Sequence, residues 1–242
     1  MRIRLTFEFE GKMLLPLNYN HIIQASILNW IDDEEYQKYI HDIGYTLEKR
    51  NYKLYVFSRM EGTFNILKET KQIEFDSGCT LDISAIDEKL LMLIIQGTFK
   101  NNLRIGRNNV TVKSITKREF EPERIMRVRT KSPITVYSTV KENDQTKTLY
   151  YTPQQEEFYE KIRLNIMHKY ESYFGNKYDG DFEIKLLNEK SVKEKVIKYK
   201  NFVIKGYEGE FLIQGSSKIK ELIYNTGLGS KNSQGFGMID YF

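Results

Sequence analysis

The first residues of the chain alternate between apolar and polar side chains. Within residues 2–10, every second position from Ile3 to Phe9 is apolar, and the positions between them are mostly charged. This period of two predicts a β-strand with one buried face. In residues 21–31 the apolar positions recur every three or four residues instead, which predicts a helix. The chain therefore opens with a strand followed by a helix.

Similar patterns predict the elements that follow, as far as about residue 120. Pro16 and Asn18 mark a loop, and Asp32 and Asp33 can cap a short second helix. Residues 86–98 are apolar enough for a buried helix. Strand-like segments cover residues 53–60, 63–68, 71–76, 79–84 and 103–120. The order β-α-β-(β)-β-α-β fits a ferredoxin-like domain.

The second half of the chain repeats this order loosely. A helix is expected over residues 153–174, with Pro153 as its first helical residue, and another over 216–226, capped by Ser216 or Ser217. Strand-like segments cover residues 125–140, 182–188 and 236–242, and residues 193–205 and 207–214 resemble a hairpin. We therefore expect an α+β chain of two tandem ferredoxin-like (βαββαβ) domains.

The expected domains are residues 1–120 and 121–242, with a junction near 116–125. The first contains His21 and His41, and the second carries a glycine-rich loop. No low-complexity segment separates them, so we expect the two domains to pack directly against each other.

Composition excludes several classes of protein. The chain has 242 residues, of which 40% are hydrophobic and 29% charged, as in ordinary globular proteins. The single cysteine, Cys79, cannot form an internal disulfide or a cysteine-based zinc site, which fits a reducing, cytoplasmic compartment. Three histidines leave few ligands for a metal-dependent hydrolase. No stretch approaches the roughly 18 apolar residues of a membrane helix, and residues 1–10 lack the apolar core of a signal peptide.

Positive charge is more clustered than the net charge of +4 suggests. Lysine and arginine are concentrated within residues 113–131 and 185–205, and Arg127 and Arg129 share one face of an expected strand. Such runs are usually solvated surface, but together they could form a track for nucleic-acid phosphates. The 17 tyrosines and 14 phenylalanines could stack on unpaired bases, although most are expected in the core.

The sharpest feature is residues 227–237, which read Gly-Leu-Gly-Ser-Lys-Asn-Ser-Gln-Gly-Phe-Gly. Glycine adopts positive φ angles and lets backbone N–H groups approach a ligand, so such a loop can cradle phosphates. The segment follows an expected helix and precedes a strand, which is the wrong order for a dinucleotide fingerprint. It also lacks the spacing of a Walker loop. A plain turn between helix and strand is the alternative.

The form G-h-G-x5-G-h-G, near the end of two expected ferredoxin-like domains, resembles the signature loop of the CRISPR-associated endoribonucleases of the RAMP superfamily, in their Cas-six branch. The resemblance covers nearly the whole chain, and the loop is its most specific part. Weaker points of resemblance are Leu17–His21 before the first helix, Tyr39–Asp42, Lys53–Ser58 and Ser132–Ile134.

This resemblance implies cleavage of repeat RNA in the precursor CRISPR transcript without a metal or other cofactor, leaving 5′-hydroxyl and 2′,3′-cyclic phosphate ends. His41 falls at the position of the family's catalytic histidine, and Lys53 lies on the strand that brings a catalytic lysine. Histidine suits proton transfer because its pKa lies near cellular pH, although the sequence leaves open whether His41 acts as base or acid. Lys53 would stabilise charge on the phosphate.

One position departs from the family pattern. Many members carry a catalytic tyrosine on the first helix, and Leu28 stands there in this chain. A leucine cannot transfer a proton, so Tyr19, Tyr45 or His21 would replace it, or two residues suffice. His168 is expected to be a surface or boundary residue.

The RNA partner would also contact the glycine-rich loop and the basic residues. The expected RNA-binding residues are Gly227, Gly229, Lys231, Asn232, Ser233, Gly235, Gly237, Arg127, Arg129 and Lys131. Two alternatives from other classes remain open, namely a non-catalytic repeat-RNA-binding protein and a scaffold subunit of a CRISPR effector complex. A homodimer is also left open, and no membrane partner is expected.

Overall fold

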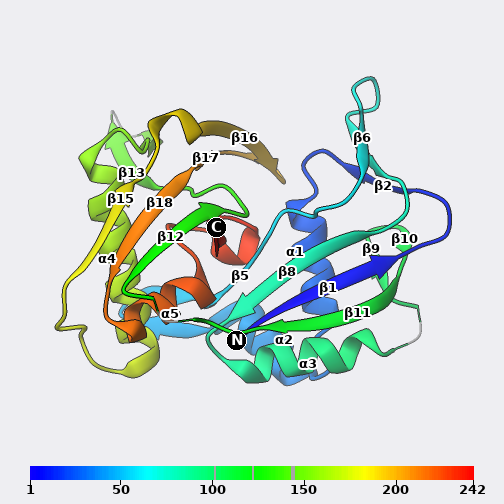
Figure 1. The fold of residues 1–242 in the computed structure, drawn as a ribbon, viewed down its shortest axis with the longest axis horizontal. Helices are drawn as coiled ribbons and strands as arrows, with labels where there is room; N and C mark the ends of the chain where they lie inside the picture. The colour runs from blue at the N-terminus through cyan, green and yellow to red at the C-terminus, as the bar shows by residue number, and fades with distance from the viewer. Residues whose placement is uncertain (101, 122, 143–144) are drawn as a thin grey trace.

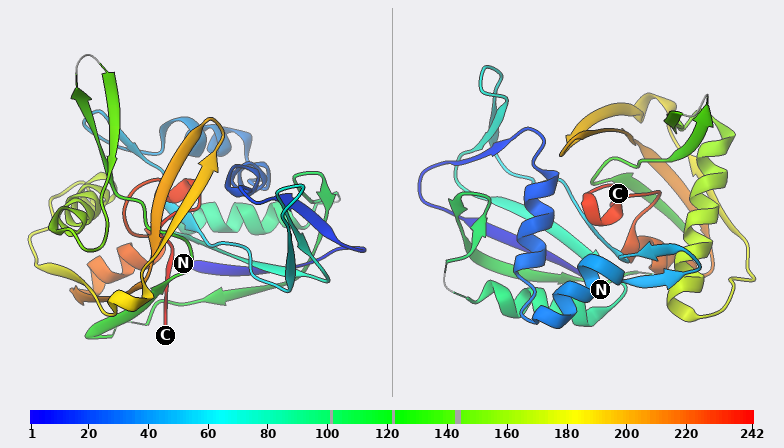
Figure 2. Two further views of the ribbon diagram at one scale, coloured as in Figure 1. Left: turned by 90° about the horizontal axis from the view of Figure 1, so that it is seen from above. Right: turned by 180° about the vertical axis from the view of Figure 1, so that it is seen from behind.

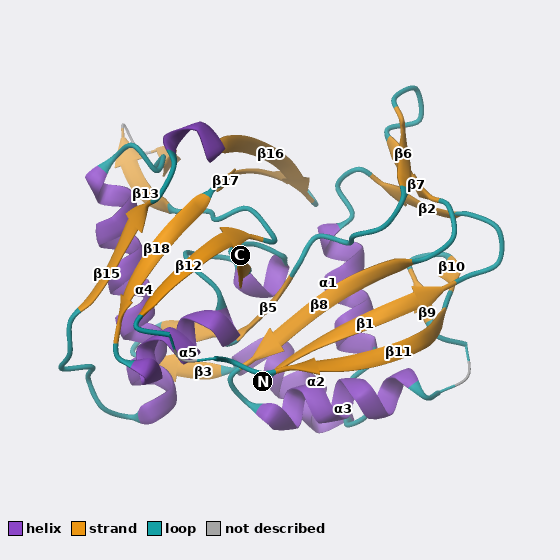
Figure 3. Cartoon of the chain, in the orientation of Figure 1, coloured by secondary structure: helices purple, strands orange, loops and turns teal. Residues whose placement is uncertain are grey.

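Two four-stranded antiparallel sheets lie side by side, and helices cover one face of each (Figures 1 and 3). The computed structural model describes residues 1–100, 102–121, 123–142 and 145–242. Residue 122, within the expected junction between the domains, lies outside the described residues. The domain limits 1–120 and 121–242 stay a prediction, although β11 and β12, on either side of the junction, belong to different sheets.

The first sheet has the strand order β11-β1-β8-β5. Its strands are β1 (Arg2–Glu8), β5 (Tyr55–Phe57), β8 (Cys79–Ala85) and β11 (Thr111–Arg118). Helix α1 (Asn20–Asn29) lies between β1 and β5 in the chain, and α3 (Glu88–Thr98) lies between β8 and β11. The first and third strands of the β-α-β-β-α-β order are therefore central, and the second and fourth are the edges.

The second sheet has the equivalent order, β15-β18-β12-β19. Its strands are β12 (Ile125–Thr130), β15 (Phe182–Leu186), β18 (Glu210–Gly215) and β19 (Ile239–Tyr241), and its helices are α4 (Glu156–Phe174) and α5 (Ser217–Thr226). The expectation of an α+β chain with two tandem ferredoxin-like domains is confirmed.

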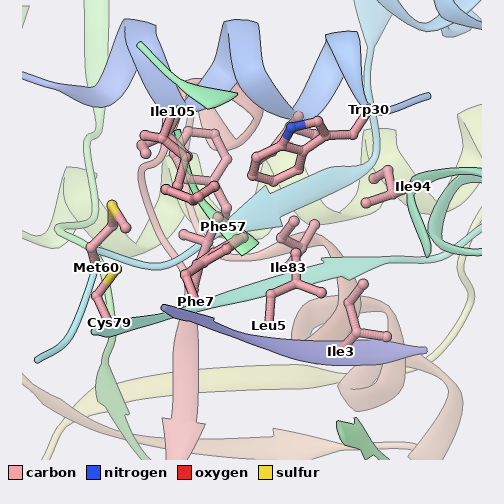
Figure 4. Packing of buried hydrophobic residues seen from close by; sticks show 14 of the residues in the cluster. Ile3, Leu5, Phe7, Trp30, Phe57, Met60, Cys79, Ile83, Ile94 and Ile105 are labelled. Atoms are coloured by element: carbon pink, nitrogen blue, oxygen red, sulfur yellow. The ribbon is translucent and has the colours of Figure 1, made fainter. Parts of the chain in front are cut away.

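Each sheet buries its helix-facing side chains in its own core. In the first core, Ile3, Leu5 and Phe7 of β1 point toward Trp30, at the end of α1, and toward Ile94 of α3 (Figure 4). These are the apolar positions of the period-two pattern, and burial of each large side chain stabilises the fold by about 1.5–3 kcal/mol. The second core gathers residues such as Val128, Phe158 and Ile219 in the same way.

The remaining elements are a short helix, helical turns and added hairpins (Figure 2). Helical elements are α2 (Glu34–Lys38), capped by Asp33 as expected, the π-helix η1 (Tyr39–Ile43), and the 3₁₀ turns η2 (Glu189–Ser191) and η3 (Asn232–Gln234). The added strands are β2 (Met13–Pro16), β3 (Tyr45–Leu47), β4 (Arg50–Tyr52), β6 (Phe64–Leu67), β7 (Gln72–Phe75), β9 (Arg104–Ile105), β10 (Asn108–Asn109), β13 (Tyr137–Glu142), β14 (Gln145–Tyr150), β16 (Lys193–Tyr199) and β17 (Phe202–Glu208).

Three expectations about these elements are wrong. Helix α4 begins at Glu156 with Gln155 as its N-cap, so Pro153 lies in the turn before the helix. Residues 125–140 form two strands, β12 and β13, in different sheets.

The third wrong expectation concerns the hairpin that begins at residue 193. The hairpin consists of β16 and β17, because the chain turns at Lys200, whose φ is 52°. Strand β18, expected as the second arm, joins the second sheet instead.

A buried ion pair joins the two domains. The Arg2 side chain is fully buried, and its Nη1 lies 3.2 Å from Oδ1 of Asp240 in β19. Its Nη2 donates to the carbonyl of Tyr224 (2.7 Å), and its guanidinium lies 3.6 Å from the centre of the Tyr224 ring. Arg118 of β11 reaches the other oxygen of Asp240 at 2.8 Å. The expected direct packing of the domains therefore includes a shared network of charges.

Candidate functional site

The glycine-rich loop, residues 227–237, folds back on itself between α5 and β19. All four of its glycines have φ between 68° and 82°. The ends of the loop are joined by the Leu228 N–H, which donates to the carbonyl of Gly237 (2.8 Å). A Cβ atom on Gly237 would collide with the Leu228 carbonyl. The glycines are therefore needed for the tight shape of the loop.

Two buried polar side chains hold the loop from within. Asn232 donates through Nδ2 to the carbonyls of Leu228 (3.0 Å) and Phe236 (2.9 Å). Lys169 of α4 donates through Nζ to Asn232 Oδ1 (2.7 Å) and to the Gly227 carbonyl (2.8 Å). Because the amide of Asn232 is used inside the loop, its position favours a structural role over direct contact with a ligand.

The loop also contacts the first domain. Asn20 of α1 donates through Nδ2 to the carbonyls of Gln234 (3.0 Å) and Gly235 (3.2 Å), and the Tyr55 hydroxyl donates to the Ser233 carbonyl (3.4 Å). A Cβ atom on Gly235 would lie 2.5 Å from the ring of Phe57. The loop therefore fills the junction between the two domains.

A cleft of about 760 Å³ opens beside the loop, and we call it the glycine-loop cleft. Four segments line it, namely residues 50–55, residues 136–139, the facing side of α4, and residues 229–234. Among the described residues that line the cleft, five are basic and none carries a carboxylate. The basic residues are Arg50, Lys53, Lys161, Lys169 and Lys231. The cleft therefore suits a polyanion.

Several polar atoms at this cleft have no hydrogen-bond partner among the described residues. They are buried side-chain atoms of Tyr52, Lys53, Asn165 and Gln234. A buried polar group without a partner costs about 1–3 kcal/mol. A ligand that reached them after a small side-chain movement would recover that cost.

Lys53 lines the cleft and also contacts the end of the π-helix η1. Its side chain packs beside Gly44, the residue that ends η1, and η1 carries His41 and Asp42. Burial lowers the pKa of Lys53, and the nearby carboxylate of Asp42 partly opposes that shift. The positive charge of Lys53 therefore depends on the charge of any ligand that enters the cleft.

His41 lies on the exposed side of η1. Its Nδ1 is 2.6 Å from Oδ1 of Asp42, and its side chain is 64% exposed. A carboxylate on Nδ1 favours the tautomer that leaves Nε2 as the proton acceptor. His41 does not appear among the described residues that line the glycine-loop cleft.

Tyr45 belongs to a cluster of tyrosines around one carboxylate. The hydroxyls of Tyr36 (2.5 Å) and Tyr45 (3.0 Å) both donate to Oδ2 of Asp87. Burial and the charge of Asp87 raise the pKa of Tyr45 well above its usual value. The ring of Tyr45 also packs against Tyr39 of η1 and against Tyr173 of α4, at 6.1 and 5.4 Å between centroids. The cluster supports the segment that carries His41.

The other two proposed substitutes for the family tyrosine lie elsewhere. The Tyr19 ring is buried under Arg59, and its hydroxyl accepts a hydrogen bond from the Met60 N–H (3.1 Å). His21 contacts the Asn18 carbonyl through Nδ1 (3.1 Å) and the ring of Tyr199 in β16. Neither is among the described residues lining the cleft.

The expected basic residues of β12 border a second hollow of about 530 Å³, which we call the β12 hollow. Arg129 and Lys131 line it, and Arg127 is exposed on the same strand. The charge of Lys131 is already compensated by an ion pair with Glu61 and by Asp82 at 3.8 Å. The expected RNA-binding residues are thus divided between two surfaces.

Sequence reasoning missed the contribution of α4 and of the β3–β4 hairpin. Lys161, Asn165 and Lys169 lie four residues apart on one face of α4, so they line the cleft together. Arg50 of β4 lines it too and donates to Nδ1 of His168 (3.4 Å). The four-residue spacing of polar side chains was the available signal in the sequence.

Among the residues that the structure describes, no group of three or more His, Cys, Asp or Glu side chains is arranged to hold a metal ion. No helix within residues 1–100, 102–121, 123–142 and 145–242 is long and apolar enough to cross a membrane.

Comparison with known proteins gives consistent matches. The CRISPR-associated endoribonuclease Cas6 1 of Methanocaldococcus jannaschii is 25% identical over 99% of this chain and 92% of its own length. A putative CRISPR-associated endoribonuclease-like protein Cas6 of Pyrococcus furiosus is 26% identical over 99% of this chain and 98% of its own length. The solved structure of a Cas6-related gene product from P. furiosus superposes with a TM-score of 0.84 at 25% identity, covering 100% of this chain and 98% of that one.

The family model described as CRISPR associated protein Cas6, C-terminal, matches residues 115–241. That match takes in more than half of the chain, including β12, α4 and the whole glycine-rich loop, and the relatives named above cover the rest. The chain therefore belongs to the Cas6 family of CRISPR-associated proteins.

Proposed function

We propose that the protein is a metal-independent endoribonuclease that cuts CRISPR repeat RNA within the precursor transcript, in the cytoplasm. The observation that carries this proposal is the glycine-loop cleft, which combines Lys53 with the glycine-rich loop and has five basic and no acidic lining residues. The named relatives are described as endoribonucleases or endoribonuclease-like proteins, which supports the same reaction class.

In this reaction the RNA supplies its own nucleophile. The 2′-oxygen bonds to the adjacent phosphorus, and the bond from phosphorus to the 5′-oxygen of the next nucleotide breaks. The 2′-hydroxyl loses a proton and the departing oxygen gains one, so the products are a 2′,3′-cyclic phosphate and a 5′-hydroxyl. The protein must align these atoms, move the two protons and stabilise the negative charge on the phosphate.

We assign the proton transfer to His41 and the charge stabilisation to Lys53. The contact of His41 with Asp42 orients the imidazole, and a general acid–base group contributes about 10²–10⁴-fold to the rate. A phosphate entering the cleft would accept a hydrogen bond from the Lys53 ammonium, which has no hydrogen-bond partner among the described residues. Tyr45 supports η1 through Asp87 and is proposed as a positioning residue.

RNA binding is assigned first to the glycine-loop cleft. Lys231 and Ser233 border the cleft, and the buried glycines shape the loop that presents them. Arg127 and Arg129 on the exposed face of β12 would contact RNA beyond the cleft, with Lys131 contributing less because it is already paired.

A non-catalytic repeat-RNA-binding protein is the second candidate function. Two observations favour it, namely Leu28 at the family's tyrosine position and His41 outside the lining of the cleft. Such a protein would keep the cleft and lack cleavage, alone or as a subunit of an effector complex.

The test is cleavage of a repeat RNA in excess EDTA. We expect the wild-type protein to cut once and to fail on RNA carrying a 2′-deoxy sugar at the scissile nucleotide. His41→Ala should slow cleavage by at least about 10²-fold, with little effect on RNA affinity. Lys53→Met should slow cleavage as well, because it removes the cation assigned to the transition state.

His21→Ala is the matched control for His41→Ala, since both replace a partly exposed histidine of the first domain. If His21→Ala abolishes cleavage and His41→Ala does not, the assignment of His41 is wrong. Tight binding of repeat RNA without any cleavage would establish the binding protein instead of the enzyme.

A further inference from the structure

Lys169 is a buried lysine beneath the glycine-rich loop. The residue is only 3% exposed, and its Nζ donates to the carbonyls of Thr226 (3.3 Å) and Gly227 (2.8 Å) and to Oδ1 of Asn232 (2.7 Å). No carboxylate pairs with it within the described part of the chain. The side chain thus joins α4, the end of α5 and the loop.

The three acceptors match the three N–H groups of an ammonium. A neutral amine has only two N–H groups and directs a lone pair at the third acceptor. Loss of the proton would therefore remove at least one of the contacts to Thr226, Gly227 or Asn232. Because Asn232 in turn holds the carbonyls of Leu228 and Phe236, the loss would spread through the loop.

As long as no anion is bound in the cleft, the surroundings of Lys169 disfavour its charged form. Burial lowers its pKa to about 7. The other charged side chains known to line the cleft, within the described part of the chain, are all cations, namely Arg50 and Lys53 from the first domain, Lys161 from α4 and Lys231 from the loop. His168, the preceding residue of α4, contacts Arg50, and its own pKa is lowered by burial and by that arginine. A polyanion bound in the cleft would instead favour the charged form of Lys169.

We propose that Lys169 is a positioning residue whose ammonium keeps the loop in the shape that presents Lys231 and Ser233 to RNA, so that RNA binding is coupled to protonation of Lys169. The proposal rests on the proposed function in that RNA is the ligand, but it does not require cleavage. In this role Lys169 contacts the loop and not the reacting atoms of the RNA.

The test is the affinity for a repeat RNA with a 2′-deoxy scissile nucleotide, measured by fluorescence anisotropy between about pH 6 and pH 8.5. The wild-type Kd should be constant at the acidic end. It should weaken above about pH 7, approaching tenfold for each further pH unit, because binding then requires uptake of a proton.

Two substitutions separate this role from a merely structural one. Lys169→Met removes the charge and should bind RNA weakly with no dependence on pH in this range. Lys169→Arg keeps a permanent charge and should bind at pH 8.5 more tightly than the wild-type protein does. Thermal unfolding of both variants shows that the comparison is made on folded protein.

Lys161→Met and His168→Gln are the matched controls on the same helix. Lys161→Met should weaken binding at every pH and leave the pH profile of the wild type unchanged. His168→Gln should also keep that profile, and if it flattens the profile, the titrating group is the histidine and the proposal is wrong.

The outcomes also distinguish this inference from the proposed function. Cleavage together with a wild-type Kd that does not change with pH would overturn the role of Lys169 and leave the enzyme assignment intact. A pH-dependent Kd without cleavage would support Lys169 in an RNA-binding protein. No RNA binding at any pH would overturn both.

Discussion

Asp82, which lies close to Lys131 of the β12 hollow, shows what one buried carboxylate contributes to stability. Both of its oxygens accept hydrogen bonds of 2.7 Å from Arg4, and Lys131 lies 3.8 Å away. Burial alone would raise the pKa of Asp82, but the hydrogen bonds and charge of Arg4 outweigh burial, and the pKa lies below its usual value. The folded state is therefore stabilised by the ionised form.

A pH dependence of stability follows from Asp82. Because its pKa is lower in the folded than in the unfolded state, its contribution is complete above the unfolded pKa of about 3.9 and is lost as the pH falls through the folded value. Asp82→Asn should therefore lower the unfolding temperature at pH 7, and the difference from wild type should shrink below about pH 4. Thermal unfolding at both pH values measures this.

The control for Asp82 is Asp181→Asn, at an exposed position. It should leave the unfolding temperature unchanged at both pH values. A constant difference between wild type and Asp82→Asn from pH 7 down to pH 3 would contradict the argument, since protonation would then not matter.

Individual residues differ in how far the sequence reveals them. The glycine pattern alone singled out the loop, and family resemblance predicted His41 and Lys53, whereas Lys169 was missed. A lysine in a polar stretch of helix is normally exposed, and no local pattern reveals that the loop covers it. Its partners lie 57 to 63 residues further along the chain.

At the scale of elements, the glycine-rich loop is rigid because its backbone is fixed at both ends. Its ends meet through Leu228 and Gly237, and the Ser230 N–H donates to the Thr135 carbonyl (2.8 Å). The Gly237 N–H donates to the Pro133 carbonyl (2.9 Å). A substitution that disturbs this closure should therefore affect the element as a whole.

Gly237→Ala tests the closure of the loop. Its φ of 81° and the collision of a Cβ atom with the Leu228 carbonyl predict a loss of at least about 2 kcal/mol in the free energy of unfolding. RNA affinity should fall as well. Chemical denaturation and anisotropy give the two values.

Gly175→Ala is the matched control for Gly237→Ala. Gly175 ends α4 with a similar φ of 75°, but a Cβ atom there would meet no atom within 4 Å. It should cost only about 1 kcal/mol and leave RNA affinity unchanged. Equal losses for both variants would show that backbone strain, and not the closure of the loop, sets the cost.

Strands with a buried face were predictable, and the exposed strand β14 was not. Strand β1 has the period-two pattern of a half-buried strand, and it was found. Hairpin β13–β14 lies mostly on the surface, so its strand β14 has no apolar alternation and was missed. The glycine-loop cleft was also beyond sequence reasoning, because its lining comes from four separate parts of the chain.

At the scale of the whole molecule, the two domains depend on each other for charge balance. Asp240 of the second domain accepts from both Arg2 and Arg118 of the first. Burial lowers the pKa of Arg2, and Asp240 is among the groups that oppose the shift. Since the glycine-loop cleft also takes residues from both domains, anything that separates them should open the site.

Asp240→Asn tests this dependence. Removal of one partner of a buried ion pair typically costs about 3–5 kcal/mol. We expect a loss of this size in the free energy of unfolding, and a thermal transition that broadens or divides because the domains no longer unfold together.

Glu119→Gln provides the comparison for Asp240→Asn, since it removes an exposed ion pair with Lys117 at 2.9 Å. It should not change stability measurably. A single sharp transition with unchanged stability in Asp240→Asn would contradict the coupling of the domains.

The Arg2–Asp240 pair has a consequence for protein synthesis. The two residues are separated by 238 positions, so a ribosome releases Arg2 into water long before it translates the strand that neutralises it. A nascent first domain can form its sheet, but it has to leave this guanidinium hydrated. Final docking then waits for β19, and the glycine-loop cleft is assembled only after residues 229–234 have been translated.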